Sequence, residues 1–241
     1  MTIIDVASSA SAAPISCSRL RCRMPTVLIT GANRGIGLEF ARQYSADGWE
    51  VVATVRESSP ELDSLGIRVE QLDMRELDAV ASLGERLETL DVLIANAGTY
   101  GPRSPRKGDE GEEWLETFAV NTIAPYLLAQ SVLPLADRSG GKLIAISTRM
   151  GSIEDNSSGG YIAYRSSKSA LNMAWRSLAI DNAGKVACAI LHPGWVQTRM
   201  GGSSAPLSPD DSVSGMRRVI QGLGSDQSGG FFSYDGSKIP W

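Results

Sequence analysis

Short apolar runs alternate with amphipathic segments along most of the chain. The strand-length runs are Thr26–Thr30, Glu50–Val55, Ile67–Glu70, Leu90–Ala95, Lys142–Ser147 and Val186–Leu191. The most apolar of these runs show no polar alternation, which is typical of strands that are buried on both faces. The pattern therefore predicts six strands, and Phe231–Tyr234 is a candidate for a last strand at the edge.

Helix-length segments separate these runs. Apolar residues recur at spacings of three and four in Leu38–Ala46, Asp78–Thr89, Trp114–Leu135, Tyr164–Asn182 and Asp210–Leu223. Such spacing places apolar side chains on one face of a helix. Alternating strands and helices predict an α/β fold, a doubly wound Rossmann-type parallel sheet with helices on both faces. The 241 residues suffice for one domain of this kind and not for two of ordinary size.

The first 23 residues differ from the rest of the chain. They are rich in Ser and Ala, carry arginines at positions 19, 21 and 23, and lack the apolar segment of a secretory signal. We expect residues 1–23 to be a disordered or non-native extension, with Met24 as the alternative start, and residues 24–241 to form the folded domain. The Arg and Ser content leaves a transit peptide as the weaker alternative.

Composition restricts the classes of partner. The formal net charge of −4 provides no basic field for nucleic acid, and no apolar run approaches the roughly 20 residues that a membrane span needs. Cys17, Cys22 and Cys188 fit neither a disulfide framework nor a zinc cluster, so we expect a reducing, cytoplasmic location. The single histidine, His192, nearly excludes a metal site held mainly by histidine, and we expect no metal.

A glycine-rich turn connects the first strand to the first helix. Thr30 is followed by Gly31-Ala32-Asn33-Arg34-Gly35-Ile36-Gly37. Missing Cβ atoms let the backbone turn tightly, and the N–H groups at the helix start can then bind a pyrophosphate. The alternative is that the glycines only make a tight turn.

Further motifs follow at the ends of later strands. They are Asn96-Ala97-Gly98, Asn121 within a predicted helix, Ser147-Thr148, Tyr164-x-x-x-Lys168 and Pro193-Gly194. A tyrosine with an ordinary pKa of about 10 is a poor base at neutral pH unless a positive charge stabilises its phenolate. Lys168 lies one helical turn after Tyr164 on the same face, so it can lower the pKa of that phenol.

In this order, from Thr26 to Trp241, the motifs resemble those of the short-chain dehydrogenase/reductase family. The segments Gly151–Gly160 and Tyr164–Asn172 and the ending Gly230–Trp241 resemble the branch of C-factor and sniffer-type carbonyl reductases. The resemblance implies an oxidoreductase that uses NADP(H) to reduce an aldehyde or ketone to an alcohol, or to catalyse the reverse. It also implies a homodimer or homotetramer that packs through its long helices.

The resemblance assigns roles to individual residues. Tyr164 is the proton donor or acceptor, Lys168 also binds the nicotinamide ribose, Thr148 orients the substrate oxygen, and Asn121 holds a water that links Lys168 to solvent. The implied cofactor-binding residues are Gly31, Asn33, Arg34, Gly35, Ile36, Gly37, Arg56, Asp73, Met74, Asn96, Ala97, Gly98, Tyr164, Lys168, Pro193, Gly194, Val196 and Thr198.

The choice of cofactor depends on the end of the second strand. An acidic residue there binds the ribose 2′-hydroxyl of NAD, whereas a cation accommodates the 2′-phosphate of NADP. The position of that acid corresponds to Val55, and Arg56 follows it, with Arg34 as a second cation. These residues favour NADP(H). The alternative is a solvated Arg56 paired with Glu57.

The substrate end departs from the family pattern. Thr148 stands where the family usually has a serine; its hydroxyl can donate the same hydrogen bond, but its methyl group narrows the site. Ser147 remains an alternative. The segment Arg199–Ser208 is a short substrate cover, which suggests an open cleft, with Trp195, Met200 and Trp241 as flanking candidates.

Two functions from other classes compete with a reductase. One is an NADP-binding regulatory or signalling protein of the same fold with weak or lost turnover, which Thr148 leaves open. The other is a serine hydrolase, for which His192, placed beside Pro193-Gly194, is a poor candidate base.

Overall fold

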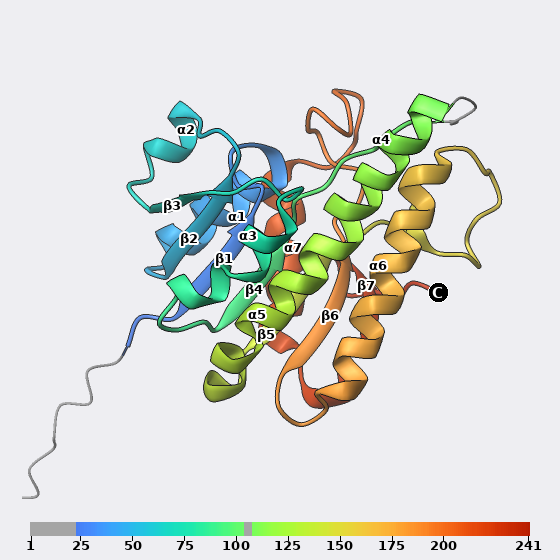
Figure 1. Cartoon of the computed structure of the whole chain (residues 1–241). Coiled ribbons are helices and arrows are strands. Elements are labelled where there is room, and N and C mark those ends of the chain that lie inside the picture. Colours follow the sequence, from blue (N-terminus) through green and yellow to red (C-terminus); the bar gives the residue numbers. More distant parts are fainter. Residues whose placement is uncertain (1–22, 104–107) are drawn as a thin grey trace, which may run out of the picture.

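Seven strands form one parallel sheet in the computed structural model, which describes residues 23–103 and 108–241 (Figure 1). The strand order is β3-β2-β1-β4-β5-β6-β7. The strands are β1 (Thr26–Thr30), β2 (Glu50–Val55), β3 (Arg68–Gln71), β4 (Val92–Ala95), β5 (Lys142–Ile146), β6 (Ala187–His192) and β7 (Gly230–Ser233). This order confirms the predicted doubly wound fold, and β7 pairs with β6 as the expected edge strand.

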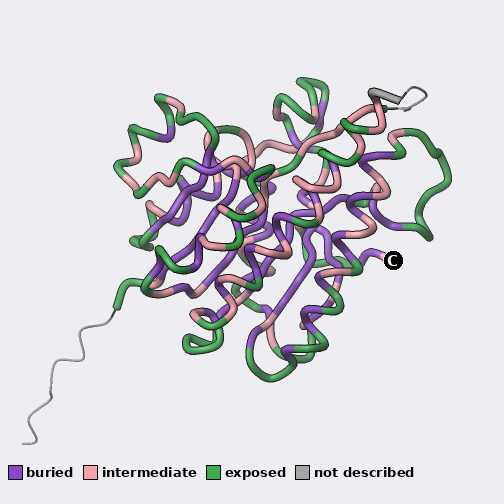
Figure 2. The backbone as a smooth tube through the Cα atoms, viewed as in Figure 1, coloured by how far each residue is buried: buried purple, intermediate pink, exposed green. Residues whose placement is uncertain are grey.

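Helices cover both faces of the sheet. Alternate strand residues point to opposite faces, so Val27 and Ile29 belong to one apolar core and Leu28 to the other. The first core contains α1 (Gly35–Ala46), α2 (Pro60–Asp63) and α7 (Pro209–Gly222). The second contains α3 (Leu77–Ala81), α5 (Ala124–Ser139) and α6 (Ile162–Asp181). Figure 2 shows the strands as the most continuously buried part of the chain.

Two local features differ from the sequence-based prediction. The short helix α2 was not predicted, although Ser59 caps it by accepting a hydrogen bond from the Leu62 amide at 3.2 Å and Pro60 begins it. The helix expected over Asp78–Thr89 ends at Ala81 and continues as a 3₁₀ turn, Leu83–Arg86. A Cβ on Gly84 would lie 2.2 Å from the Ser131 carbonyl, so glycine permits close packing against α5.

The longest helical stretch contains a π turn. Helix α4 (Gly108–Phe118) continues through η2 (Ala119–Ile123) into α5, whereas one helix over Trp114–Leu135 was expected. The stretch Glu110–Ser139 is long and apolar enough to cross a membrane, but core helices of soluble proteins pass the same test and α5 packs on the sheet. Although only 33% of its most apolar window is fully buried, partly buried residues such as Val120, Leu127 and Leu133 also pack against the core.

The topology brings distant sequence motifs together at one edge of the sheet. The carboxyl ends of parallel strands lie at the same edge. Strands β2 and β3 are added on one side of β1 and strands β4 to β7 on the other, so the strand order reverses between β1 and β4. Ligands of open α/β sheets bind at such a switch point. The expected extension over residues 1–23 lies outside the described residues except for Arg23, whose guanidinium pairs with Asp91 at 2.7 Å.

Candidate active site

A cleft of about 1710 Å³ lies at the carboxyl edge of the sheet. Most of the predicted site residues line it: Gly31, Asn33, Arg34, Gly35, Ile36, Gly37, Arg56, Asp73, Met74, Asn96, Ala97, Gly98, Tyr164, Lys168, Pro193 and Thr198. Four predicted residues are not among those that line it, namely Asn121, Thr148, Gly194 and Val196. Its volume exceeds the roughly 300–1,000 Å³ of an ordinary small-molecule pocket, which leaves room for a dinucleotide and a substrate.

The glycine turn is packed too tightly for side chains. Gly31 has a φ of 67°, and a Cβ on Gly37 would lie 2.3 Å from the Gly31 carbonyl oxygen. Arg34 occupies the N-cap of α1 without a side-chain cap, and the first turn of α1 contains no acidic residue. The amides at the start of α1 are therefore available to an anion, so this turn fits the pyrophosphate of a dinucleotide.

Thr30 holds the second loop of the cleft, a role that the motif search missed. Its hydroxyl oxygen accepts hydrogen bonds from the amides of Asn96 at 3.0 Å and Ala97 at 2.9 Å. The Asn96 side-chain amide donates in return to the Thr30 carbonyl at 2.9 Å. Thr30 is 1% exposed, so this link between β1 and the end of β4 is shielded from water.

Six arginines line the cleft: Arg34, Arg42, Arg56, Arg75, Arg103 and Arg199. Asp73 is already paired, because hydrogen bonds from Arg75, the strongest influence, lower the pKa of its carboxyl group, and the charge of Arg56 lowers it further. The predicted cation Arg56 is thus accompanied by Arg75, which was not predicted.

Tyr164 lies at the opposite end of the cleft, on the first turns of α6. Burial raises the pKa of its phenol well above the ordinary value of 10, the nearby Tyr100 raises it further, and a hydrogen bond with Thr148 opposes both. The shift is opposite to the one expected from Lys168. At neutral pH this phenol is therefore protonated and able to donate.

Lys168 is a buried amine one turn along α6 from Tyr164. It is 4% exposed, and its Nζ donates a hydrogen bond to the Ile146 carbonyl, at the end of β5, at 2.8 Å. Burial lowers the pKa of the amine from 10.5 to about 8. Because the Lys168 ammonium is directed at the Ile146 carbonyl of β5, it does not stabilise the phenolate of Tyr164.

Asn121 lies in the π turn and is fully buried. Its side-chain amide donates to the Thr99 carbonyl at 2.8 Å and the Ser167 hydroxyl at 3.0 Å, and its oxygen accepts from the Thr99 amide at 2.9 Å. A Cβ on Gly98 would lie 3.2 Å from the Asn121 oxygen and 3.6 Å from Lys168 Nζ. The space left by Gly98 therefore adjoins both side chains.

The two hydroxyls at the end of β5 have different partners. The Ser147 hydroxyl donates to the side-chain amide oxygen of Asn172 at 2.7 Å in a buried pair. Thr148 accepts from the Met150 amide at 3.1 Å, and its side chain lies near enough to Tyr164 to lower the pKa of that phenol. Ser147 contributes to the cleft wall, but its hydroxyl is engaged with α6, whereas the Thr148 hydroxyl lies beside the catalytic candidate.

The short cover after β6 is held at both of its ends. The Trp195 indole donates to the Gly201 carbonyl at 2.7 Å, and the Gln197 backbone amide donates to the Leu207 carbonyl at 2.8 Å. Of the three flanking candidates, only Met200 lines the cleft; Trp195 bonds within the cover, and Trp241 packs on Phe231.

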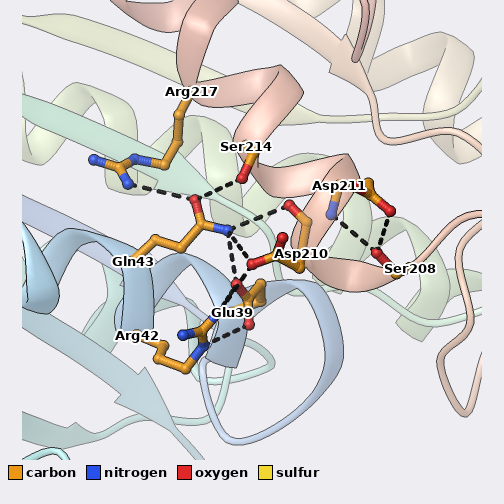
Figure 3. A network of polar contacts seen from close by, with 8 residues as sticks. All are labelled: Glu39, Arg42, Gln43, Ser208, Asp210, Asp211, Ser214 and Arg217. Carbon is orange, nitrogen blue, oxygen red and sulfur yellow. Dashed lines mark hydrogen bonds and ion pairs between the residues drawn. The ribbon is translucent and has the colours of Figure 1, made fainter.

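A polar network anchors α7, which follows the cover, to α1 (Figure 3). Ser208 caps α7 by accepting from the Asp211 amide at 3.0 Å. Asp210, in the first turn of α7, accepts from Arg42 at 3.0 Å, and Gln43 donates to the Asp210 carbonyl at 3.3 Å. Glu39 and Arg42 of this network also line the cleft, so the end of the cover is fixed relative to the glycine turn.

His192 is the last residue of β6 and shows no serine partner. Burial lowers the pKa of its imidazole to about 4, with a smaller effect from Arg149, and Nδ1 has no hydrogen-bond partner among the described residues. Since the Ser147 hydroxyl is bonded to Asn172, the described part of the chain gives no support to a serine hydrolase.

Comparisons with known proteins agree with this geometry. A family model described as short chain dehydrogenase matches residues 25–207. The "C-signal" protein of Myxococcus xanthus is 43% identical over 154 residues, which cover 63% of this chain and 93% of that protein. The structure of the carbonyl reductase Sniffer of D. melanogaster superposes with a TM-score of 0.84 at 36% identity, and that of the NADPH-bound carbonyl reductase from chicken fatty liver with 0.80 at 34%. Both structural alignments cover 91% of this chain and 100% of the other.

The buried Lys168 is expected to reduce stability. Its folded-state pKa of about 8 lies below the unfolded value of 10.5, so burying the ammonium costs free energy below about pH 8, and the cost fades as the pH rises towards 10.5. Lys168→Met should therefore raise the free energy of unfolding at pH 7 by about 1–3 kcal/mol, and by less at pH 10. Chemical denaturation measures both values. Lys185→Met, at an exposed site, is the control, and an unchanged or lower value for Lys168→Met at pH 7 would contradict this cost.

Proposed function

Because the chain belongs to the short-chain dehydrogenase/reductase family, we propose that it reduces an aldehyde or ketone to an alcohol with NADPH, or catalyses the reverse oxidation. One observation carries the proposal: Tyr164 and Lys168 line the same cleft as the glycine turn, and the Thr148 hydroxyl lies beside Tyr164. The relatives named as carbonyl reductases support the class of reaction.

The residues divide the proton chemistry between them. The bound cofactor supplies the hydride to the carbonyl carbon. Tyr164 gives its phenolic proton to the carbonyl oxygen, so the C=O bond becomes an alcohol and the phenolate remains. The phenol of Tyr164, whose pKa is raised by burial, is protonated before the step, as reduction requires. Thr148 donates a hydrogen bond to the same oxygen as negative charge develops there.

Lys168 and Asn121 return the proton to Tyr164. With a pKa of about 8, Lys168 can exist in both protonation states near neutral pH. Its Nζ adjoins the space beside Gly98, which Asn121 also faces. A water in this space, held by Asn121, would connect Lys168 to solvent. We assign the ribose hydroxyls of the cofactor to Lys168 as well.

We propose NADP(H) rather than NAD(H) as the cofactor. Arg34, Arg56 and Arg75 line the cleft, and both Arg56 and Arg75 lie near Asp73. Val55 at the strand end offers no acceptor for a ribose hydroxyl, and the carboxylate of Asp73 is paired with Arg75. The chicken carbonyl reductase was solved with NADPH bound.

A signalling or regulatory protein with weak turnover is the second candidate. It is favoured by the identity of 43% with the "C-signal" protein. The two functions differ in one observable: a reductase consumes NADPH with a carbonyl substrate, whereas a regulator binds NADPH without consuming it. A panel of aldehydes, ketones and quinones, followed by the loss of NADPH absorbance, separates them.

Tyr164→Phe should lower reduction by roughly 10²–10⁴-fold, because it removes the transferable proton and leaves the ring. NADPH affinity, measured by fluorescence titration, should remain nearly unchanged. Lys168→Ala should lower both the rate of reduction and the affinity for NADPH, because Lys168 returns the proton to Tyr164 and binds the nicotinamide ribose. Tyr126→Phe, which alters a tyrosine on α5 outside the cleft, is the control. Retained turnover in Tyr164→Phe would show that another group donates the proton.

Thr148→Ala should lower turnover by roughly a hundredfold, the loss that follows removal of one donor to an oxyanion. Thr148→Ser should keep most activity. Ser147→Ala should instead reduce stability, because it leaves the buried Asn172 oxygen without its donor. Steady-state kinetics and thermal unfolding give the two readouts. A folded Ser147→Ala with the larger loss of turnover would transfer the role to Ser147.

Arg56→Ala should weaken NADPH binding by about ten- to a hundredfold, the contribution of a hydrogen bond to a charged group, and leave NADH binding nearly unchanged. Isothermal titration calorimetry measures both affinities. Arg68→Ala, which removes the partner of Glu70 on β3, is the control because Arg68 does not line the cleft. Equal losses for both cofactors would contradict the assignment.

We propose a homodimer or homotetramer. Exposed apolar side chains lie on the adjacent helices α4 to α6, namely Leu115, Ile123, Ile162, Met173 and Ile180. Light scattering at micromolar concentration should show an oligomer, and Ile180→Glu should shift it towards monomer because it places a charge in the interface. Ile153→Glu, at a more exposed site in the loop before α6, should not. A wild-type monomer would refute the proposal.

A further inference from the structure

Tyr100 connects three parts of the active site. It follows the Asn96–Gly98 loop and lines the cleft. Its ring meets that of Tyr164 edge to face, with centroids 4.7 Å apart, and its hydroxyl donates to the carbonyl of Met200 in the cover at 3.3 Å. No other tyrosine in the described part of the chain makes a ring contact with Tyr164.

A second tyrosine supports this ring from behind. Tyr161 packs against Tyr100 with ring centroids 5.7 Å apart, and the guanidinium of Arg103 lies 5.1 Å from the centre of the Tyr161 ring. Tyr161 adopts a left-handed backbone conformation with a φ of 50°, the only such non-glycine residue described. That conformation is strained for tyrosine, and a ring held in a strained position at an active site suggests a fixed function.

The position of Tyr100 restricts what can bind beside a reacting carbonyl. If the substrate oxygen bonds to Tyr164 and Thr148, the group attached to the carbonyl carbon falls within a few ångströms of the Tyr100 ring. The apolar side chains Val120 and Met200 line the same cleft. A planar group can lie against an aromatic ring over its whole area, whereas a puckered ring of similar size touches it only at a few atoms.

We infer that Tyr100 is a specificity-determining residue that selects carbonyl compounds with a planar, conjugated group next to the carbonyl, and that Tyr161 positions it. The inference rests on the proposed reductase function and names its substrate class. Tyr100 contacts the substrate, whereas Tyr161 acts through Tyr100. The hydroxyl of Tyr100 also bonds to the Met200 carbonyl, so the same ring contacts the cover.

Two aldehydes of matched size test this inference: benzaldehyde, which is planar, and cyclohexanecarbaldehyde, which is puckered. The readout is the ratio of their kcat/KM values, compared between wild type and variants so that the different reactivity of the two aldehydes cancels. Tyr100→Leu should lower the benzaldehyde preference by about two- to tenfold, the range that ring contacts contribute. Tyr100→Phe should keep the ratio because the ring remains. Tyr126→Leu, which removes a ring outside the cleft, should also keep it.

The outcomes separate the inference from the proposed function. A folded Tyr100→Leu with the wild-type ratio overturns the role of Tyr100 and leaves the reductase intact. A folded wild-type chain that binds NADPH and reduces neither these aldehydes nor the wider panel overturns both. Should Tyr100→Leu fail to fold in thermal unfolding, Tyr161→Leu decides: a lowered ratio supports the inference, and an unchanged ratio overturns it.

Discussion

The hydrogen bond from Lys168 Nζ to the Ile146 carbonyl is the contact on which the active site depends, because it joins the catalytic helix α6 to the end of β5. Two further bonds fix the same pair of elements. The Trp175 indole donates to the Leu143 carbonyl at 2.9 Å, and Ser147 donates to Asn172 at 2.7 Å. Together they set the register of α6 against β5, and this register places Tyr164 beside Thr148.

The proposed chemistry uses two groups whose charged forms are destabilised by burial. A buried amine and a buried phenol are costly to ionise, and the protein keeps both within one turn of a helix. In the proposed reduction, the protonated phenol donates its proton, and an amine with a pKa of about 8 can replace that proton near neutral pH.

Sequence reasoning predicted the parts of the site that depend on local chemistry. The glycine turn and the Tyr164 to Lys168 spacing are local, and periodicity predicted all seven strands to within two residues at each end. The parts that it missed depend on contacts between distant residues. Thr30 bonds to residues 66 and 67 positions away, and the π turn at Asn121 accompanies side-chain bonds to Thr99 and Ser167. The direction of the Tyr164 pKa shift also followed from burial and from a carbonyl that captures Lys168, neither of which a helical spacing reveals.

Isotope transfer tests the central claim, reduction by hydride transfer at this cleft, most directly. The protein is incubated with a carbonyl substrate and NADPH that carries deuterium at C4 of the nicotinamide, and mass spectrometry locates the label. NADPH deuterated on one of the two faces of C4 should give an alcohol with one deuterium on the former carbonyl carbon. With Tyr164→Phe, labelled alcohol should not rise above background. Two results would contradict hydride transfer at this cleft. One is an unlabelled alcohol with NADPH deuterated on either face of C4, and the other is the same yield of labelled alcohol from Tyr164→Phe.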